Sequence, residues 1–501
     1  MAECILLEDK CMVRKGAINL LQEPMRINKS REEQVMRLQI KNKYTFTIQK
    51  KEVGYAIIGA MWLIFFYGYF YSDILITTSH AINFWDIIFS GRILDFHALC
   101  CSDVENDAYT ITHIYAGYDF PIYVLFGIWN FPLWVIRKIT GINIWKSVFA
   151  MMWAKSIILV FIVLTVQALK KLCNTIEMPD RKRNVVMIFL TSPIIASSAV
   201  VNSQYDIITA YFMLEALNCF LNRKMKRFVG YIIIATMIKP FALFMFVPLV
   251  LYAEKNVIKI GIYTLCVMIP YVGVRVLIQN HTQLTTYSTI LTLFKNKLNI
   301  AGTEIPIFFL VSFLFWIVCY MYHVPDDKKS FYRNSIGISY LSLAIFFMLC
   351  ATNPYWVIML LPIQCMMIGI NKEYEILSVI LETVGSICLI GHYVIEFPWC
   401  FDVNIVRTSF FAKIFGIRSD TTDNVLDIIH NFSESLYEMR DRASGFAFGL
   451  FFTTSLVFIW LNLMKHQNIA MENETMPKYM PWIRIFLSFA VCLLPMIAYI
   501  L

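Results

Sequence analysis

The sequence predicts an all-α membrane protein, a polytopic transmembrane helical bundle of about 12 spans. Of the 501 residues, 58% are hydrophobic and only 16% are charged, with a mean hydropathy of +0.61, whereas soluble domains carry about 25% charged residues. Apolar runs of roughly 20 residues recur along the chain, which is the length a helix needs to cross hydrocarbon. The runs are continuous rather than alternating, which favours helices over a closed β-barrel.

The charge distribution predicts the orientation of the first span. Basic residues are frequent before the first apolar run, so the positive-inside rule places the N-terminus in the cytoplasm of a multi-pass plasma-membrane protein. A nucleic-acid partner is not expected, because these basic residues adjoin a membrane helix and form no dense block. The first residues lack the apolar core and small-residue cleavage site of a cleavable signal peptide.

Three regions are predicted along the chain. They are a basic cytoplasmic segment (1–53), a catalytic transmembrane module (54–260) and a more variable transmembrane region (261–501) with a polar external insert near 396–442. The apolar runs are 54–71, 119–136, 145–169, 185–201, 207–221, 229–252, 258–278, 305–322, 335–350, 356–370, 376–394, 446–464 and 483–501. A basic cluster follows the third run. The run at 119–136 is therefore expected to dip into the membrane and return, helped by Pro121 and Pro132.

The acidic loop after the first span holds the candidate catalytic carboxylates. A short interfacial helix is predicted at 82–89, with Trp85 as its anchor. Asp73, at the end of the first span, can act as a general base or hold a divalent ion, or can simply cap a helix. Asp86 is the alternate base, or part of a solvated face. His80 and Asn83 flank this patch as candidate substrate contacts, although a solvated histidine is the simpler interpretation.

Further polar residues interrupt the apolar runs. Asn202, Gln204 and Asp206 form a dense polar turn that could bind sugar hydroxyls, or could be an ordinary turn. Lys239 lies within an apolar run, where a lysine costs about 2.5–3.5 kcal/mol on insertion scales and therefore usually has a partner or a function. A phosphate would be a natural counter-ion, and the alternative is snorkelling to the interface. Pro240 beside it breaks the helix.

The remaining candidates are weaker individually. Arg275 also lies in an apolar run and could bind a phosphate, but snorkelling is the stronger alternative for it because it is close to a polar loop. Asp119 opens the next apolar run and joins the candidate substrate contacts. The group Asn353, Tyr355 and Trp356 interrupts two apolar runs and would suit a sugar or phosphate, or an aromatic belt at the interface.

The order of these features resembles the GT-C superfamily of membrane glycosyltransferases, which use polyprenyl-phosphate sugars as donors. In that superfamily an acidic residue follows the first helix, as Asp73 does here. Its Gly-Gln-x-Asp-like turn is similar to 202–206, its Lys-Pro-bearing span to 239–240, and its His-Pro-x-Tyr/Trp-like element to 353–356. The chain is most similar to bacterial, mannosyltransferase-like members that serve surface polysaccharide or glycolipid synthesis.

The resemblance implies an inverting sugar transfer from a polyprenyl-phosphate donor to a glycan or lipid acceptor hydroxyl at the external face of the lipid bilayer. Asp73 would be the base and Asp86 its alternate, Lys239 and Arg275 would hold phosphate, and the other polar residues would line the pocket. A divalent cation is compatible with this chemistry, but no metal ligands are named because no Asp-x-Asp or Asp-Glu pair follows the first helix. Two alternatives stay open: a transporter or flippase of lipid-linked glycans, and a non-catalytic subunit of an assembly complex.

Overall fold

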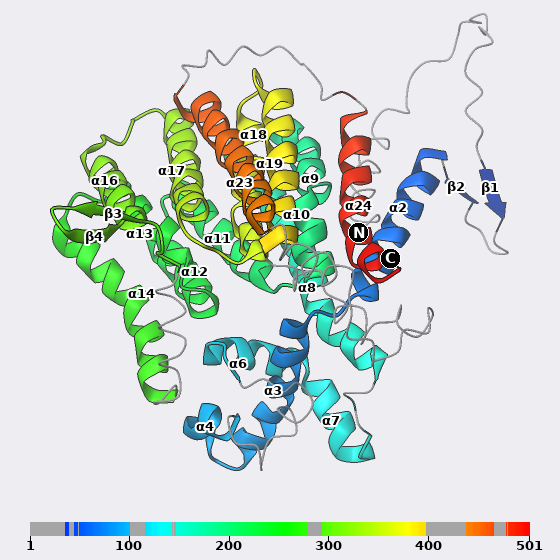
Figure 1. The fold of residues 1–501 in the computed structure, drawn as a ribbon. Helices are drawn as coiled ribbons and strands as arrows, with labels where there is room; N and C mark the ends of the chain where they lie inside the picture. Colours follow the sequence, from blue (N-terminus) through cyan, green and yellow to red (C-terminus); the bar gives the residue numbers. More distant parts are fainter. Residues whose placement is uncertain are drawn as a thin grey trace, which may run out of the picture. The chain divides into compact units, whose positions relative to one another are not determined.

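The computed structural model describes residues 36–39, 45–48, 50–100, 116–142, 144, 147–278, 293–396, 437–464, 477 and 479–500 (Figure 1). The chain divides into two compact units, Met1–Phe66 and Tyr67–Leu501. In the first unit, β1 (Met36–Gln39) and β2 (Thr45–Ile48) form an antiparallel hairpin that the sequence did not predict. The helix α2 (Lys50–Gly68) begins in this unit.

The second unit is built almost entirely of helices among its described residues, which confirms the all-α class (Figure 1). Its first part comprises α3 (Ser72–Phe89), η2 (Ile93–Asp95), α4 (Phe96–Cys100), α6 (Phe120–Trp129), α7 (Phe131–Thr140), α8 (Val148–Thr175), η4 (Pro179–Arg181), α9 (Lys182–Leu190), α10 (Pro193–Ile195), the π-helix η5 (Ala196–Val201), α11 (Asp206–Leu221), α12 (Met225–Ile238), α13 (Ala242–Ala253) and α14 (Val257–Ile278). Its second part comprises α16 (Ile307–Met321), α17 (Lys328–Leu349), η6 (Pro354–Met359), α18 (Leu361–Ile370), α19 (Glu375–Glu396), α23 (Tyr437–Ile459), the π-helix η8 (Trp460–Met464) and α24 (Met480–Ile500).

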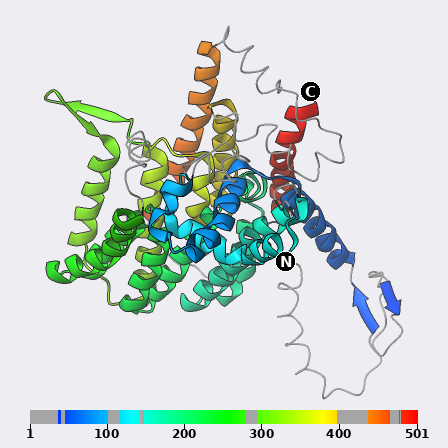
Figure 2. The same ribbon diagram turned by 90° about the horizontal axis from the view of Figure 1, so that it is seen from below.

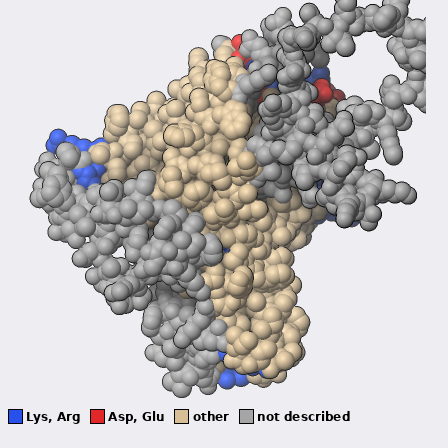
Figure 3. All heavy atoms as spheres, turned by 90° about the vertical axis from the view of Figure 1, so that its right-hand side faces the viewer, with Lys and Arg blue, Asp and Glu red and all other residues tan. Residues whose placement is uncertain are grey.

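The described helices are consistent with a membrane protein. Within the described ranges, four helices are long and apolar enough to cross a bilayer, or up to seven if each of three bent pairs is one span. Shorter apolar helices such as α13 and α16 add to these. Large apolar side chains along α14 are exposed, including Ile258 and Val276. In Figure 3 the described atoms across the middle of the face are mostly uncharged, and the visible charged groups lie toward its ends. The predicted total of about 12 spans stays a prediction.

Several apolar runs are broken where the sequence carries proline or polar residues. The helices α6 and α7 are bent by 65° at Asn130, so the run at 119–136 is not one straight span, as predicted. The run at 229–252 ends its first helix at Ile238 and resumes at Ala242, because Pro240 has no N–H to donate. A second hairpin, β3 (Lys297–Ile300) with β4 (Thr303–Pro306), was not predicted and lies at the edge of the unit (Figure 2).

The helix after the first span is longer and more buried than predicted. It runs from Ser72 to Phe89 as α3, and its Phe84 packs with residues of α4 and α6 in one apolar cluster. Trp85 donates from Nε1 to the carbonyl oxygen of Gly127 at 2.8 Å. A Cβ at Gly127 would lie 2.6 Å from the Phe84 ring, so only glycine allows α3 and α6 to approach this closely.

The helix α4 carries a buried histidine that predicts a pH effect on stability. The Nδ1 atom of His97 lies 3.2 Å from the carbonyl oxygen of Ala116. Burial lowers the pKa of His97 from 6.5 to about 4. Between these values the unfolded chain binds a proton that the folded chain does not, so the free energy of unfolding decreases as the pH falls, by up to about 3 kcal/mol.

We therefore expect the unfolding temperature of the wild-type protein to drop between pH 6.5 and pH 4.5, the interval in which the low pKa of His97 keeps it neutral in the folded state. The unfolding temperature of a His97→Gln variant should fall less over the same pH interval, because the variant has no imidazole at this position to protonate. Thermal unfolding in detergent at several pH values measures both. An equal loss in the two proteins would show that His97 is not the source.

Candidate functional site

Two residues predicted to belong to the site meet at the start of α3. Asp73 lies in the first turn of α3 and is 8% exposed. Gln204, 131 positions later, donates from Nε2 to Oδ2 of Asp73 at 2.7 Å. The hydroxyl of Tyr118 interacts electrostatically with Asp73. Burial, together with the nearby Asp73 carboxylate, raises the pKa of Tyr118, so this hydroxyl stays protonated and can donate. Asp73 is thus held in one orientation.

The backbone that presents Gln204 is unusual. The π-helix η5 runs directly into the polar turn, and Ser203 adopts a φ of +53°. Asn202 donates from its backbone N–H to the carbonyl oxygen of Ser197, and Gln204 donates to that of Ser198, both at 2.9 Å. π-helical segments and left-handed non-glycine residues are uncommon, and both concentrate at functional sites. The turn is therefore more than an ordinary connection between helices.

Lys239 and Asp206 form a second buried contact beside the first. Lys239 Nζ lies 3.2 Å from Oδ1 of Asp206, with side chains 10% and 0% exposed. The same ammonium lies 5.0 Å from the ring centre of Tyr205, 5.1 Å from that of Trp356 and 5.8 Å from that of Tyr118. Aromatic faces attract cations at these distances. The lysine points into the protein, so the snorkelling alternative does not describe it.

The segment around Pro354 completes the cluster. Asn353 donates from Nδ2 to the Tyr355 hydroxyl at 3.1 Å. The Tyr355 ring packs edge-on against the ring of Tyr71, with ring centroids 6.0 Å apart. Tyr71 comes two residues before Asp73 in the chain. Trp356 contributes one of the rings around Lys239. We define the polar cluster as Asp73, Tyr118, Asn202, Gln204, Tyr205, Asp206, Lys239, Asn353, Tyr355 and Trp356.

Several buried polar atoms of the turn have no hydrogen-bond partner among the described residues. They are Oδ1 of Asn202, Oγ of Ser203, Oε1 of Gln204, the hydroxyl of Tyr205 and, apart from the ion pair with Lys239, both carboxylate oxygens of Asp206; Oγ of Ser198 before the turn and Oγ1 of Thr209 after it are in the same state. Buried polar atoms are nearly always hydrogen-bonded, so such a concentration in one place calls for an explanation. Mixed donors and acceptors of this kind suit a ligand rich in hydroxyl groups.

Other predicted residues lie outside the polar cluster. Asp86 Oδ1 accepts from Trp134 Nε1 at 2.9 Å and lies 2.8 Å from Lys138 Nζ. Asn83 Oδ1 accepts from Arg137 at 3.1 Å. Asp86 is 13 positions after Asp73 on α3, a distance of about 20 Å along the axis. The two carboxylates therefore cannot serve the same reacting atom.

The three remaining predicted residues have other neighbours. Arg275 donates from Nε and Nη2 to Oδ1 of Asp119, at 2.9 and 2.7 Å. His80 is fully buried, and its ring packs edge-on against that of Tyr123 at 6.0 Å. The expectation of a solvated histidine was therefore wrong. The histidine is buried because α3 packs against the rest of the protein on more than one of its faces.

Several buried charges were missed by the sequence reasoning, and three of them lie inside long apolar runs. Lys155 of α8, Glu382 of α19 and Arg484 of α24 are each at most 3% exposed. Arg484 donates to Glu382 and Thr383, to Oγ1 of Thr191 at 3.0 Å and to the Ile188 carbonyl at 2.8 Å. A charged residue inside a long apolar run was the available signal, because such residues usually have a partner or a function.

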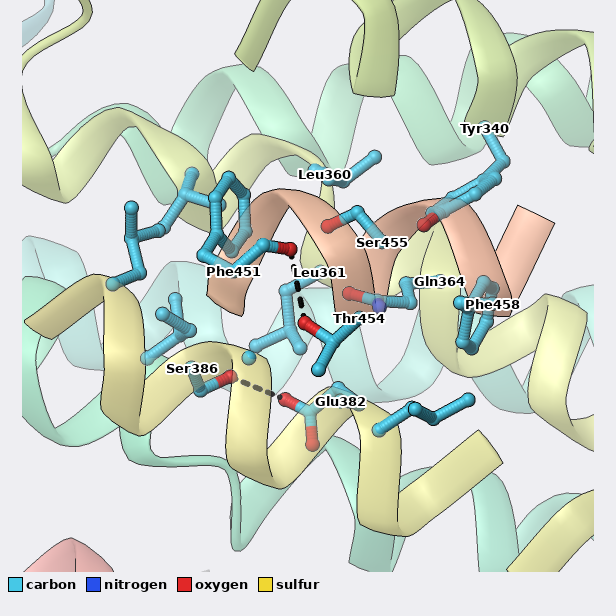
Figure 4. A pocket seen from close by; sticks show the side chains of 15 residues that line it. Tyr340, Leu360, Leu361, Gln364, Glu382, Ser386, Phe451, Thr454, Ser455 and Phe458 are labelled. Carbon is cyan, nitrogen blue, oxygen red and sulfur yellow. Dashed lines mark hydrogen bonds between the residues drawn. The ribbon is translucent and has the colours of Figure 1, made fainter. Parts of the chain in front are cut away.

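Glu382 also lines a small pocket between α19 and α23 (Figure 4). Ser192 and Ser386 donate to its Oε1 at 2.7 and 3.1 Å. The pocket wall is otherwise mainly apolar, with Leu360, Phe451 and Phe458 among its residues. The carboxylate of Glu382 is thus already occupied by partners from the protein, which marks this place as a structural ion pair.

The fold and the polar cluster together define a helical membrane protein with an occluded polar site. No family model, curated protein or solved structure matches this chain. Among the residues that the structure describes, no three His, Cys, Asp or Glu side chains gather as metal ligands. The function must therefore be argued from the site itself.

Proposed function

We propose that this protein is a membrane glycosyltransferase that moves a sugar from a polyprenyl-phosphate donor to an acceptor hydroxyl at the external membrane face. One observation carries the proposal: a buried carboxylate, Asp73, is oriented by Gln204 beside the Lys239–Asp206 contact. The base Asp73 and the cation Lys239 are thus enclosed together with groups that can bind hydroxyls. Sugar transfer from a phosphate requires these three kinds of group.

In the proposed reaction, Asp73 accepts the proton of the acceptor hydroxyl. The acceptor oxygen then attacks the anomeric carbon of the donor sugar, and the bond from that carbon to the phosphate oxygen breaks. The electron pair leaves with the polyprenyl phosphate, and because the acceptor attacks from the opposite face, the anomeric configuration is inverted. Lys239 stabilises the negative charge that develops on the phosphate. The unpartnered atoms of Asn202, Gln204 and Tyr205 bind sugar hydroxyls.

A transporter of lipid-linked glycans is the second candidate, and specific observations favour it. Broken helices around buried charges are typical of transporters. Here α12 and α13 are interrupted at Lys239. Buried charges at Lys155, Glu382 and Arg484 add to Lys239. The two functions differ in chemistry, because a transporter leaves the sugar–phosphate bond intact.

The test begins with lipid extracts of a strain lacking the protein and of the same strain complemented with wild type or Asp73→Asn. Mass spectrometry should find a polyprenyl-phosphate monosaccharide that accumulates without the protein and with the variant. That lipid is then added to purified protein in liposomes, with EDTA or Mg²⁺. Release of unglycosylated polyprenyl phosphate supports transfer. An intact donor that merely changes leaflet supports transport, and no change in any lipid contradicts both.

A further inference from the structure

Lys155 is a buried basic residue that the proposed reaction does not use. It lies on α8, within a 28-residue helix, and its side chain is fully buried. Its Nζ donates to the carbonyl oxygen of Tyr69 at 2.8 Å and to that of Val200 at 2.7 Å. The ammonium also lies 5.9 Å from the ring centre of Phe70. One side chain thus joins two segments that are far apart in sequence.

The two carbonyl groups occupy equivalent positions relative to the site. Tyr69 comes four residues before Asp73, and Val200 comes four residues before Gln204. Asp73 and Gln204 are the pair joined by the 2.7 Å hydrogen bond. Tyr69 lies in the break before α3, and Val200 lies in the π-helix η5. Neither segment is a regular α-helix, so each depends more strongly on contacts from outside.

The last helix contributes a second contact to the same segment. The hydroxyl of Tyr69 donates to the carbonyl oxygen of Cys492 in α24 at 2.5 Å. α24 also packs against η5 and α10. Tyr69 is therefore held at both its carbonyl and its hydroxyl, by α8 and by α24. The start of α3 is fixed from two directions.

We propose that Lys155 is a positioning residue, which holds the start of α3 and the turn after η5 at the separation that the Asp73–Gln204 hydrogen bond requires. An ammonium serves this purpose because it can donate to two carbonyl oxygens at once. Buried charges are weak contributors to stability compared with well-packed apolar residues. A buried lysine at this position is better explained by a site that needs a fixed geometry than by stability, because small displacements of reacting groups reduce rates strongly.

This inference rests on the proposed transferase site, so the first experiment measures transfer. We expect Lys155→Met to lower kcat at least tenfold and to raise KM as well, because the base Asp73 and the sugar-binding turn after η5 are both displaced. Lys155→Arg keeps two donors and should recover kcat to within a few-fold of wild type. The matched control is Arg181→Met, which removes another buried cation, paired with Glu375 at 2.6 Å outside the polar cluster.

Unfolding temperatures of all variants separate positioning from a general loss of structure. If positioning is the role, Arg181→Met loses at least as much thermal stability as Lys155→Met, because it leaves the buried Glu375 carboxylate without its cation, but only Lys155→Met loses kcat. Equal losses of kcat in the two variants would overturn the inference, as would full activity of Lys155→Met. Should Lys155→Met fail to fold, Lys155→Gln replaces it in the same comparison, because it keeps an N–H donor without the reach to both carbonyls.

A second readout needs no catalytic activity. Cysteines are placed at the paired positions, as Asp73→Cys with Gln204→Cys, and the linked peptide is measured by mass spectrometry after mild oxidation. We expect the cross-linking rate to fall several-fold when Lys155→Met is added, and to stay unchanged with Arg181→Met. Unchanged cross-linking in the Lys155 variant rejects the positioning role. Reduced cross-linking in a protein that shows no transfer would reject the proposed function and keep the positioning role.

Discussion

The Asp73→Asn variant is expected to lose sugar transfer by a factor of about 10² to 10⁴, the usual contribution of a general base. Asn has nearly the same shape as Asp, and its Oδ1 can still accept from Gln204 Nε2, so the contact at 2.7 Å persists without the basic group. Donor binding should therefore change little. The measurement is single-turnover transfer in liposomes, with donor affinity determined separately.

Asp86→Asn is the matched control for this prediction. Both residues lie on α3, but Asp86 pairs with Lys138 and Trp134 and is partly exposed. Its replacement should leave transfer within a few-fold of wild type. Retention of full activity by Asp73→Asn, with loss in Asp86→Asn, would reverse the assignment of the base. Full activity in both variants would remove the catalytic role from α3 altogether.

Replacing Lys239 by Met is expected to have the largest effect on stability. It leaves Asp206 buried without its counter-ion, and removing one partner of a buried pair costs about 3–5 kcal/mol in free energy of unfolding. Transfer should be lost as well, because the cation that stabilises the leaving phosphate is gone. Thermal unfolding and single-turnover transfer measure the two effects. The pair Lys297–Glu304 provides the control, since both side chains are about half-exposed and exposed pairs contribute little to stability.

The double variant Lys239→Met, Asp206→Asn separates the two roles of the lysine. Removing both charges avoids an unpaired buried carboxylate, so most of the lost stability should return. Transfer should stay low, because no cation then faces the phosphate. A double variant that transfers sugar at the wild-type rate would show that Lys239 serves only as the partner of Asp206.

The structure brings together, from distant segments, several residues that the sequence singled out as polar or helix-breaking. The turn at 202–206, the Lys239-Pro240 pair and the element at 353–356 all reach the polar cluster around Asp73. Each has a visible local signal, which is polar or helix-breaking chemistry inside an apolar run. The sugar, the donor and the catalytic role of each residue stay predictions.

The sequence by itself determined local features of the chain, namely where helices form and where they break. Long apolar runs predict membrane helices because unpaired backbone groups are costly in hydrocarbon. Prolines predict the breaks at Asn130 and Lys239 because they remove backbone donors. What only the tertiary structure decided is the choice of partners. Asp73 and Asp86 lie on one helix, and only the packing of that helix decides that Asp73 contacts Gln204 and that Asp86 contacts a lysine at the surface. The contacts of Lys155 were equally hidden, because they join backbone carbonyl groups whose positions no sequence pattern records.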